Sequence, residues 1–386
     1  MPNLKKSAEC CGCTACAAIC GKGAIKMIPD SLGFLFPEVD YEKCIECGLC
    51  ERVCSFNDQY QTPLNYSEPI PFGVRLKDIS EVMKSRSGGA FKAFSDWVLQ
   101  KNGVIYGAGY KNHFEVAHCR ATTSEGRDVF RGSKYVQSNL DGVFRQVRKD
   151  LLDGKWVLFS GTPCQTSGLK SFLPTKLQEK LIVVDIVCHG VPSPYLWRDY
   201  LKYLEDKFGK TITGVDFRDK QKYGWKDHRE TFHFSGTNIT TNTFTYIFYQ
   251  HIMLRESCEH CHFTNTRRPS DLTLADFWGW ERTGANINSD NKGLSLVLVN
   301  TPKGKEIFES TINKFHVITP TLEQCMQSHL KAPTQFNPHR YKFINDYEKH
   351  GFNYIMHHYG NIGLRYHIRH FIERIINKTK KLLHRL

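Results

Sequence analysis

Alternating apolar runs and polar segments divide the middle of the chain into strand–loop–helix units. The run KWVLFSG at 155–161 predicts a buried strand, and TPCQTSGLKSFL after it predicts a loop and a helix. LIVVDIV at 181–187 predicts a second such strand, followed by the loop CHGVPSP and the helix YLWRDYLKYLEDKFG. Consecutive units of this kind predict neighbouring parallel strands. Cys164 and Cys188 then lie just past the carboxyl ends of these strands, where open α/β sheets hold their sites.

Two groups of cysteines near the start of the chain share one spacing. Each reads C-x2-C-x2-C-x3-C, and the second group begins 34 residues after the first. Three closely spaced cysteines can hold three corners of a [4Fe–4S] cluster, while the fourth points at a second cluster. The spacing therefore predicts two clusters with crossed ligands. The first set is Cys10, Cys13, Cys16 and Cys54, and the second is Cys44, Cys47, Cys50 and Cys20.

Other uses of these cysteines fit the pattern less well. No signal peptide is recognised and the chain can build its own core, which disfavours a disulfide framework. Zinc needs only four ligands, commonly as two C-x2-C pairs. Cys11 occupies a spacer position and is expected to be a bystander, and Gly21 and Ser55 replace the usual proline without removing a ligand. Residues 1–60 resemble a bacterial two-cluster ferredoxin.

The segments around these patterns define the expected fold. At 386 residues the chain is too long for one ordinary domain. We predict an α+β protein with a small ferredoxin-like domain, a larger α/β domain with a partly parallel sheet, and a C-terminal helical tail. The expected boundaries are 1–60 for the ferredoxin-like domain, 61–71 for a proline-containing linker, 72–335 for the core and 336–386 for the tail.

Charge and hydrophobicity limit the class of protein. The net charge is +13, but residues 336–386 carry ten Lys and Arg against three Asp and Glu, so the tail alone supplies +7. No nucleic-acid motif is recognised, and a nucleic-acid partner is not expected. The hydrophobic content is 40% and no apolar run approaches 18 residues, so no spanning helix is predicted. Fifteen cysteines without a signal peptide indicate a cytoplasmic location.

A third cysteine group is predicted in the core. Cys258 and Cys261 are spaced C-x2-C, and with Cys164 and Cys188 they make four ligands, enough for a third [4Fe–4S] cluster. A zinc site that uses His260 or His262, or a set of inert buried cysteines, would also fit this pattern.

Several ordered motifs carry a family resemblance. SRSGGAF, RGSKYVQSNL, VLFSGTPCQTSGL, VDIVCHGVPSP, VDFRDK and RRPSDLTLADFWGW resemble the coenzyme F-420 hydrogenase/dehydrogenase beta-subunit family over roughly 70–335. The resemblance implies a flavin-binding reductase core with a nearby iron–sulfur cluster, and FAD is the expected flavin. Some bacterial relatives occur in polysaccharide-biosynthesis settings, so the family name does not define the substrate.

Candidate flavin contacts follow from these motifs. Ser87, Gly88 and Gly89 precede a predicted helix and offer amide N–H groups to a pyrophosphate. The same residues would also fit an ordinary helix cap and turn that binds no ligand. In the next motif, Lys134 is placed at the pyrimidine edge of the ring, with Tyr135, Gln137 and Ser138 beside it. Lys134 and Asp276 are the only candidates for a catalytic role.

Two functions from different classes remain open. The first is an iron–sulfur flavoprotein oxidoreductase that receives single electrons from a redox partner protein and reduces an unidentified small molecule. The second is an electron-transfer subunit without an activity of its own. The segment 364–386 predicts a basic amphipathic helix with a net charge of +6, suited to an anionic membrane surface, an acidic partner or ordinary packing.

Overall fold

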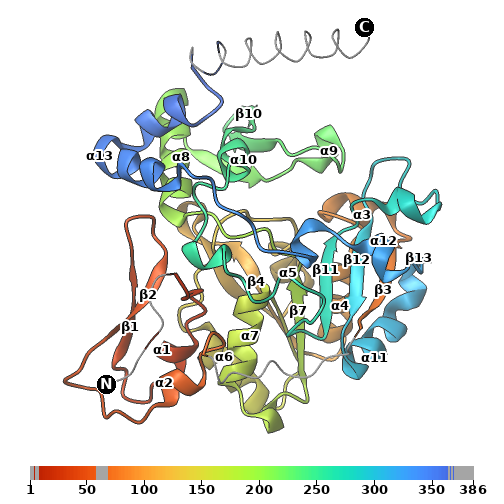
Figure 1. Cartoon of the computed structure of the whole chain (residues 1–386). Coiled ribbons are helices and arrows are strands. Elements are labelled where there is room, and N and C mark those ends of the chain that lie inside the picture. Colours follow the sequence, from red (N-terminus) through yellow and green to blue (C-terminus); the bar gives the residue numbers. More distant parts are fainter. Residues whose placement is uncertain (1–3, 5–7, 58–67, 364–365, 367, 369–386) are drawn as a thin grey trace, which may run out of the picture.

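The computed structural model describes residues 4, 8–57, 68–363, 366 and 368 (Figure 1). The strands are β1 (Ile25–Pro29), β2 (Leu35–Val39), β3 (Ile70–Leu76), β4 (Val104–Tyr110), β5 (Val116–Ala121), β6 (Val157–Gly161), β7 (Leu181–Ile186), β8 (Ile212–Asp216), β9 (Glu230–Phe234), β10 (Thr237–Thr241), β11 (Leu272–Asp276), β12 (Ser295–Val299) and β13 (Phe315–Ile318). The α-helices are α1 (Ala15–Ile19), α2 (Leu49–Arg52), α3 (Ile79–Lys84), α4 (Ala90–Leu99), α5 (Ser124–Asp128), α6 (Val143–Leu152), α7 (Pro163–Phe172), α8 (Pro194–Phe208), α9 (Lys220–Tyr223), α10 (Thr243–Phe248), α11 (Pro302–Thr311), α12 (Leu322–Cys325) and α13 (Arg340–His358).

The described residues of the core form an eight-stranded mixed sheet in the order β13-β3-β12-β11-β7-β6-β4-β5. Its centre is parallel, since β6 pairs in parallel with both β4 and β7, and β7 pairs in parallel with β11. The outer strands β5, β12, β3 and β13 pair antiparallel. The predicted partly parallel sheet and the parallel pairing of the two apolar runs are therefore confirmed.

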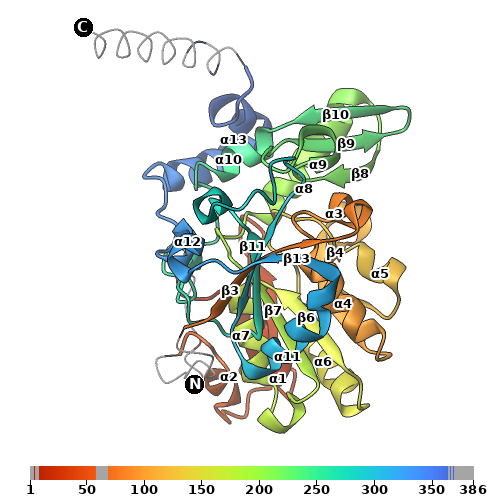
Figure 2. The same ribbon diagram turned by 90° about the vertical axis from the view of Figure 1, so that its right-hand side faces the viewer.

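Helices cover both faces of this sheet (Figure 2). Side chains alternate along each strand, so Leu158 and Ile182 pack toward α4 and α11, while Phe159 and Val183 pack toward α6 and α7. All four side chains are buried. Burial on both faces explains why these strands are continuous apolar runs in the sequence.

The N-terminal segment packs against the core on the side of α6 and α7, where the β1–β2 hairpin and α1 lie in Figure 1. Ala15 of α1 and Val53 share one buried cluster with residues of α6, α7 and the sheet. Arg145 of α6 donates hydrogen bonds to the carbonyls of Ala17 and Cys20. The cysteine-rich segment is thus docked onto the helices that flank the central strands.

A smaller antiparallel sheet, β8-β9-β10, adjoins the core together with α8 and α13. Helix α13 is interrupted at Gly351, whose φ of 74° is accessible to glycine without strain. Ile70 and Pro71, placed in the predicted linker, are the first residues of β3. The predicted amphipathic helix over 364–386 lies almost wholly outside the described residues. No helix in the described part of the chain is both long and apolar enough to cross a bilayer.

Candidate functional site

The loops that follow β6 and β7 carry Cys164 and Cys188 at one edge of the sheet. Strand β6 ends at Gly161, and Cys164 lies in the first turn of α7, which Thr162 caps together with Gln165. The Thr162 hydroxyl lies 3.2 Å from the Cys164 sulfur. Cys188 follows β7 by two residues. Because β6 and β7 are parallel neighbours, their carboxyl ends bring the two cysteines to the same edge.

Cys258 and Cys261 join these two cysteines in space. Burial raises the pKa of Cys188, and the neighbouring thiols of Cys258, Cys164 and Cys261 raise it further. Burial also raises the pKa of Cys258 to about 12 and that of Cys261 to about 11, with Cys164 acting on both. Four half-buried thiols from three separate segments therefore lie close enough to affect one another. This arrangement suits an iron–sulfur cluster, which binds thiolates and whose iron compensates their negative charge.

The first N-terminal set also contains the distant cysteine that the crossed pattern requires. Burial raises the pKa of Cys16, and Cys13, Cys10 and Cys54 raise it further. Cys54 is 38 residues beyond Cys16 in the sequence, yet it acts on Cys16 as the cysteines of the local triplet do. This grouping is the one expected for crossed ligands.

The second N-terminal set borders a cavity of its own. Cys44, Cys47, Cys50 and Cys20 all line a space of about 460 Å³, with Ile45 and Leu49 among its walls. The backbone N–H of Ala24 donates to the Cys20 sulfur at 3.3 Å. The donor set is all sulfur and is drawn from both cysteine groups, so the residues present fit a four-thiolate cluster.

A compact junction connects the first set to the core cysteines. Cys11, Phe56 and Phe263 form a buried cluster, and Cys13, Cys54, Cys164 and Cys261 pack against it. The expected bystander Cys11 is therefore only 6% exposed and lies between cysteines of the two sets. Within the described residues, no three Cys, His, Asp or Glu side chains gather tightly enough to hold a single metal ion.

A large cavity of about 810 Å³ opens at the same edge of the sheet. Cys188 and His189 form part of its wall, as does the start of α4 at Ser87 and Gly89. This volume lies within the range of cofactor and ligand pockets. Of the predicted flavin contacts, the following line it: Ser87, Gly89, Lys134, Tyr135 and Ser138.

Gly88 and Gln137 are placed differently from the other predicted flavin contacts. Gly88 is buried behind the cavity wall, where its N–H donates to the Ser295 hydroxyl and an added Cβ would lie 2.1 Å from the Val74 carbonyl oxygen. The side-chain Nε2 of Gln137 donates a hydrogen bond to the Cys11 carbonyl at 2.9 Å. Gln137 therefore faces the N-terminal segment, one residue away from the cavity-lining Ser138.

Two family models match the chain. Residues 154–324 match the C terminus of the coenzyme F420 hydrogenase/dehydrogenase beta subunit, and residues 37–57 match the 4Fe–4S binding domain. Residues 154–324 are thus similar to the C-terminal part of that beta subunit. This confirms the resemblance predicted from the motifs and identifies an iron–sulfur-containing redox protein similar to that beta subunit.

A solved structure matches the chain weakly. A structure of the F420-reducing [NiFe] hydrogenase complex from Methanosarcina barkeri contains a chain that is 15% identical and matches with a TM-score of 0.47. The match covers 70% of this chain and 97% of that one. Similarity at this level does not extend to activity. No curated protein matches the sequence.

Cationic side chains outnumber carboxylates in the lining of the large cavity. One carboxylate, Asp276, faces it among the described residues, against seven cationic side chains. These are Arg86, Lys92, Arg131, Lys134, Arg218, Arg282 and Lys331. Three of these cations already pair with carboxylates: Lys92 with Asp96, Arg131 with Glu81 and Arg218 with Asp276. The remaining cations favour an anion such as a pyrophosphate, since charges interact strongly where water is excluded.

Both carboxylate oxygens of Asp276 are already engaged. One forms an ion pair with Arg218, and the other accepts a hydrogen bond from the Trp225 indole at 2.7 Å. Burial would raise the pKa of Asp276, but Arg218 and Arg86 hold it below its usual value. The ordinary role of a carboxylate in this setting is that of a counter-ion.

The sequence pattern did not predict the group of histidines around His189, which lines the large cavity. Nε2 of His189 lies 2.7 Å from Nε2 of His251, and its Nδ1 lies 2.9 Å from Nε2 of His329. Burial, followed by His329 and His251, lowers the pKa of His189 to about 3, so its imidazole is neutral. His189 directly follows Cys188 in the CHG motif, and this position next to a candidate ligand could have indicated it.

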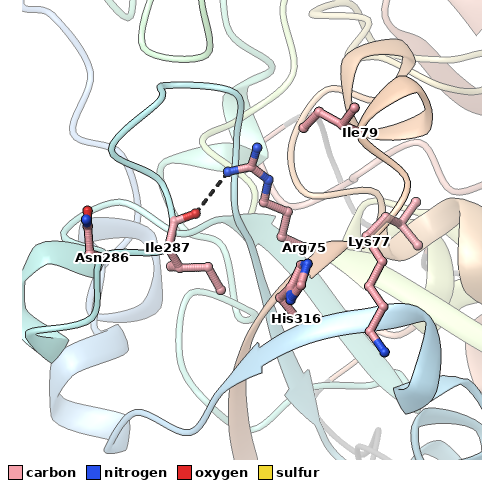
Figure 3. A pocket seen from close by; sticks show the side chains of 7 residues that line it. Arg75, Lys77, Ile79, Asn286, Ile287 and His316 are labelled. Atoms are coloured by element: carbon pink, nitrogen blue, oxygen red, sulfur yellow. Dashed lines mark hydrogen bonds between the residues drawn. The ribbon is translucent and has the colours of Figure 1, made fainter.

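A second, open cavity of about 490 Å³ lies beside β3 and β13 (Figure 3). Its main cation, Arg75, donates to the Ile287 carbonyl at 2.9 Å and pairs with Asp290 at 2.6 Å. The lining contains no cysteine and its arginine is already neutralised. The larger cavity beside Cys188 is therefore the better candidate site.

Replacing Cys20 by alanine tests the crossed ligands of the N-terminal module. Because Cys20 borders the cavity of Cys44, Cys47 and Cys50, we expect Cys20→Ala to remove the second cluster and retain the first. Low-temperature EPR of the anaerobically reduced protein checks this. The expected pattern is the loss of one of the two ferredoxin signals, matched by Cys44→Ala and not by Cys10→Ala. Loss of the signal that Cys10→Ala also removes would contradict the crossing.

Proposed function

We propose that this protein is an iron–sulfur flavoprotein oxidoreductase. In this proposal electrons from a one-electron redox partner pass through three [4Fe–4S] clusters to FAD and then to a small-molecule substrate. The ligand sets are Cys10, Cys13, Cys16 and Cys54, then Cys44, Cys47, Cys50 and Cys20, and in the core Cys164, Cys188, Cys258 and Cys261. The predicted boundaries 1–60, 61–71, 72–335 and 336–386 form part of the proposal, with the core extended to Ile70 because β3 begins there.

One observation carries this proposal. Cysteines of all three sets lie between the surface of the N-terminal module and the large cavity. Cys47 is exposed at the outer set, Cys13 and Cys54 pack with Cys164 and Cys261 at the junction, and Cys188 lines the cavity. An arrangement of this kind suits stepwise electron transfer between neighbouring centres, and its two ends provide an entry for a partner protein and an exit to a cofactor.

The cavity offers what a flavin dinucleotide requires. The first amides of the ten-residue helix α4, preceded by Ser87 and Gly89, face it and suit a pyrophosphate. Glycine is needed there because the φ of Gly89 is +92° and an added Cβ would lie 2.4 Å from Leu76. When bound, a flavin accepts single electrons and delivers them in pairs. Tyr135 and Ser138 would line the ring, and Gln137 is reserved for contacts with the N-terminal module.

Anaerobic purification with iron, sulfide and flavin quantified together tests the function. We expect about twelve iron and about twelve sulfide atoms with one flavin per chain, since each cubane holds four of each. Full iron without flavin, and no uptake of added FAD or FMN, would assign the chain to electron relay without an activity of its own. A content of about eight iron atoms and one flavin per chain would mean that only two clusters are present, and the core cluster would then be rejected.

Lys134 makes the flavin proposal dependent on pH. Its ammonium donates to the carbonyls of Val129 at 2.7 Å and Arg131 at 3.1 Å, and burial lowers its pKa to about 7. Lys134 is thus charged below about pH 7 and neutral above it. We expect Lys134→Met to lower the flavin midpoint potential at pH 6 and to have little effect at pH 8.5, because only the charged form favours an anionic reduced ring.

The control for this variant is Lys149→Met, since Lys149 is an exposed surface residue paired with Asp153. Spectroelectrochemical titration of the flavin at both pH values provides the measurement, and the ferredoxin signals should not change. Equal shifts at pH 6 and pH 8.5, or no shift at either, would contradict the assignment of Lys134 to the flavin.

A further inference from the structure

Arg255 is a buried cation without a carboxylate partner. Three arginine side chains in the described part of the chain are almost completely buried: Arg127, Arg255 and Arg268. Arg127 pairs with Asp96 at 2.8 Å, and Arg268 pairs with Asp185 at 3.1 Å. Arg255, which is 1% exposed, forms no ion pair with any described residue. A buried charge is costly unless an opposite charge compensates it, so this exception calls for a counter-charge from another source.

Three hydrogen bonds of Arg255 end on neutral oxygens at the junction between the N-terminal module and the core, and its guanidinium also interacts with the Cys10 thiol. Its Nε donates to the Cys10 carbonyl at 2.7 Å, one Nη to the Leu35 carbonyl at 2.9 Å, and the other to the Gln137 side-chain oxygen at 3.0 Å. The guanidinium also lies 4.2 Å from the centre of the Phe36 ring. These contacts direct the group without neutralising it.

The same residue holds both cysteine loops. Its side chain binds the carbonyl of Cys10, in the first N-terminal set, while its own carbonyl accepts a hydrogen bond from the Cys258 N–H at 3.0 Å, in the core set. Gly12 fits against the guanidinium so closely that an added Cβ would lie 2.8 Å from it. Arg255 also acts electrostatically on Cys10 and Cys13 on one side, and on Cys164 and Cys258 on the other.

We propose that Arg255 is a positioning residue that serves as the shared counter-cation of the first ferredoxin cluster and the core cluster. A [4Fe–4S] cluster with four thiolates is anionic and gains a further negative charge on reduction. A fixed guanidinium between two such centres favours the reduced form of each and weakens the repulsion between them.

This inference rests on the proposed function, in which both cysteine sets hold clusters. The test is an EPR-monitored redox titration of the full chain and its Arg255→Gln variant. In the variant, the equilibrium constant for reduction of the first cluster and of the core cluster should fall about tenfold. This corresponds to a decrease of ~59 mV in each one-electron midpoint potential. The second cluster is the internal reference, because Arg255 does not border its cavity.

A second neutralising variant guards against misfolding of the first. Gln137→Glu places a carboxylate against Arg255 and leaves the arginine in place, so it should also lower both potentials. Arg255→Lys keeps the charge but loses the planar fork, so it should restore the potentials toward those of the wild type. Arg145→Gln is the matched control, since Arg145 also binds carbonyls of the N-terminal module but is exposed to water.

The outcomes separate the two proposals. A wild-type chain that lacks either cluster refutes the proposed function. A wild-type chain with both clusters, whose potentials remain unchanged in Arg255→Gln or in Gln137→Glu, overturns the role of Arg255 alone. Equal shifts in Arg255→Lys and Arg255→Gln would also overturn it, because geometry and not charge would then set the potentials.

Discussion

Replacing Cys188 by alanine is expected to remove about four of about twelve iron atoms per chain and to disconnect the N-terminal clusters from the cavity. Cys188 lies in the cavity wall and belongs to the group with Cys164, Cys258 and Cys261. Three remaining thiols leave one corner of a cubane without its protein ligand. The two ferredoxin signals should persist, because their cysteines come from other segments. Iron analysis and EPR of the reduced protein provide the measurement.

Flavin reduction gives the functional readout of the same variant. In this experiment dithionite reduces the N-terminal clusters, and the oxidation state of the flavin is then followed over time. The flavin of Cys188→Ala should stay oxidised for at least tenfold longer than that of the wild type. Cys119→Ala is the control, since Cys119 is half-buried on β5 and belongs to none of the three cysteine sets. Full iron and unchanged flavin reduction in Cys188→Ala would remove the core cluster from the proposal.

Replacing Asp276 by asparagine is expected to lower the free energy of unfolding by about 3–5 kcal/mol, the usual cost of removing one partner from a buried ion pair. Arg218 is 4% exposed, and Asp276 is its carboxylate partner. Arg86 donates to the carbonyls of Arg218 and Trp225 in the same region, so the variant leaves two guanidinium groups without a nearby anion. Anaerobic denaturant titration measures the loss.

The pH dependence of this loss follows from the lowered pKa of Asp276. A carboxyl group whose folded-state pKa is depressed stabilises the protein above its unfolded pKa of about 3.9, and that stability is lost only as the pH falls through the folded value. The difference between wild type and Asp276→Asn should therefore be constant from about pH 5.5 to about pH 8. A difference that shrinks toward pH 5.5 would mean that Asp276 carries a proton in this range.

The control for Asp276→Asn is Asp153→Asn. Asp153 pairs with Lys149 on the surface, and the two side chains are 44% and 68% exposed. Water screens this pair, so its loss should cost less than about 1 kcal/mol. Equal destabilisation by the two variants would show that Asp276 has no special role in compensating the buried arginines.

Local patterns were enough to predict several parts of this protein. The two cysteine triplets lie within short segments, so their spacing alone indicates cluster loops, and the match of 37–57 to a 4Fe–4S binding domain agrees with this. The apolar runs of β6 and β7 are continuous because both faces of the sheet are covered, and each is long enough to be recognised as a buried strand. Strand, loop and helix in sequence order then require the parallel pairing.

The flavin candidates show where local reasoning becomes ambiguous. Lys134 to Ser138 are neighbours in one motif, but the structure turns Ser138 toward the cavity and Gln137 toward the N-terminal module. The sequence of an irregular loop contains no period from which the direction of a side chain can be inferred. In a strand, successive side chains point to opposite faces, and in a helix they are rotated by a fixed angle, so either element would have allowed the two directions to be predicted.

By itself the sequence determined the cysteine loops, the strand–loop–helix core and the edge at which Cys164 and Cys188 lie, because each of these depends on residues close together in the chain. Only the tertiary structure decided which groups compensate one another. Arg255 meets Cys10 across 245 residues, and Asp276 meets Arg218 across 58. Electrostatic compensation depends on distance in space and on the exclusion of water, and neither is encoded in the spacing of residues along the chain.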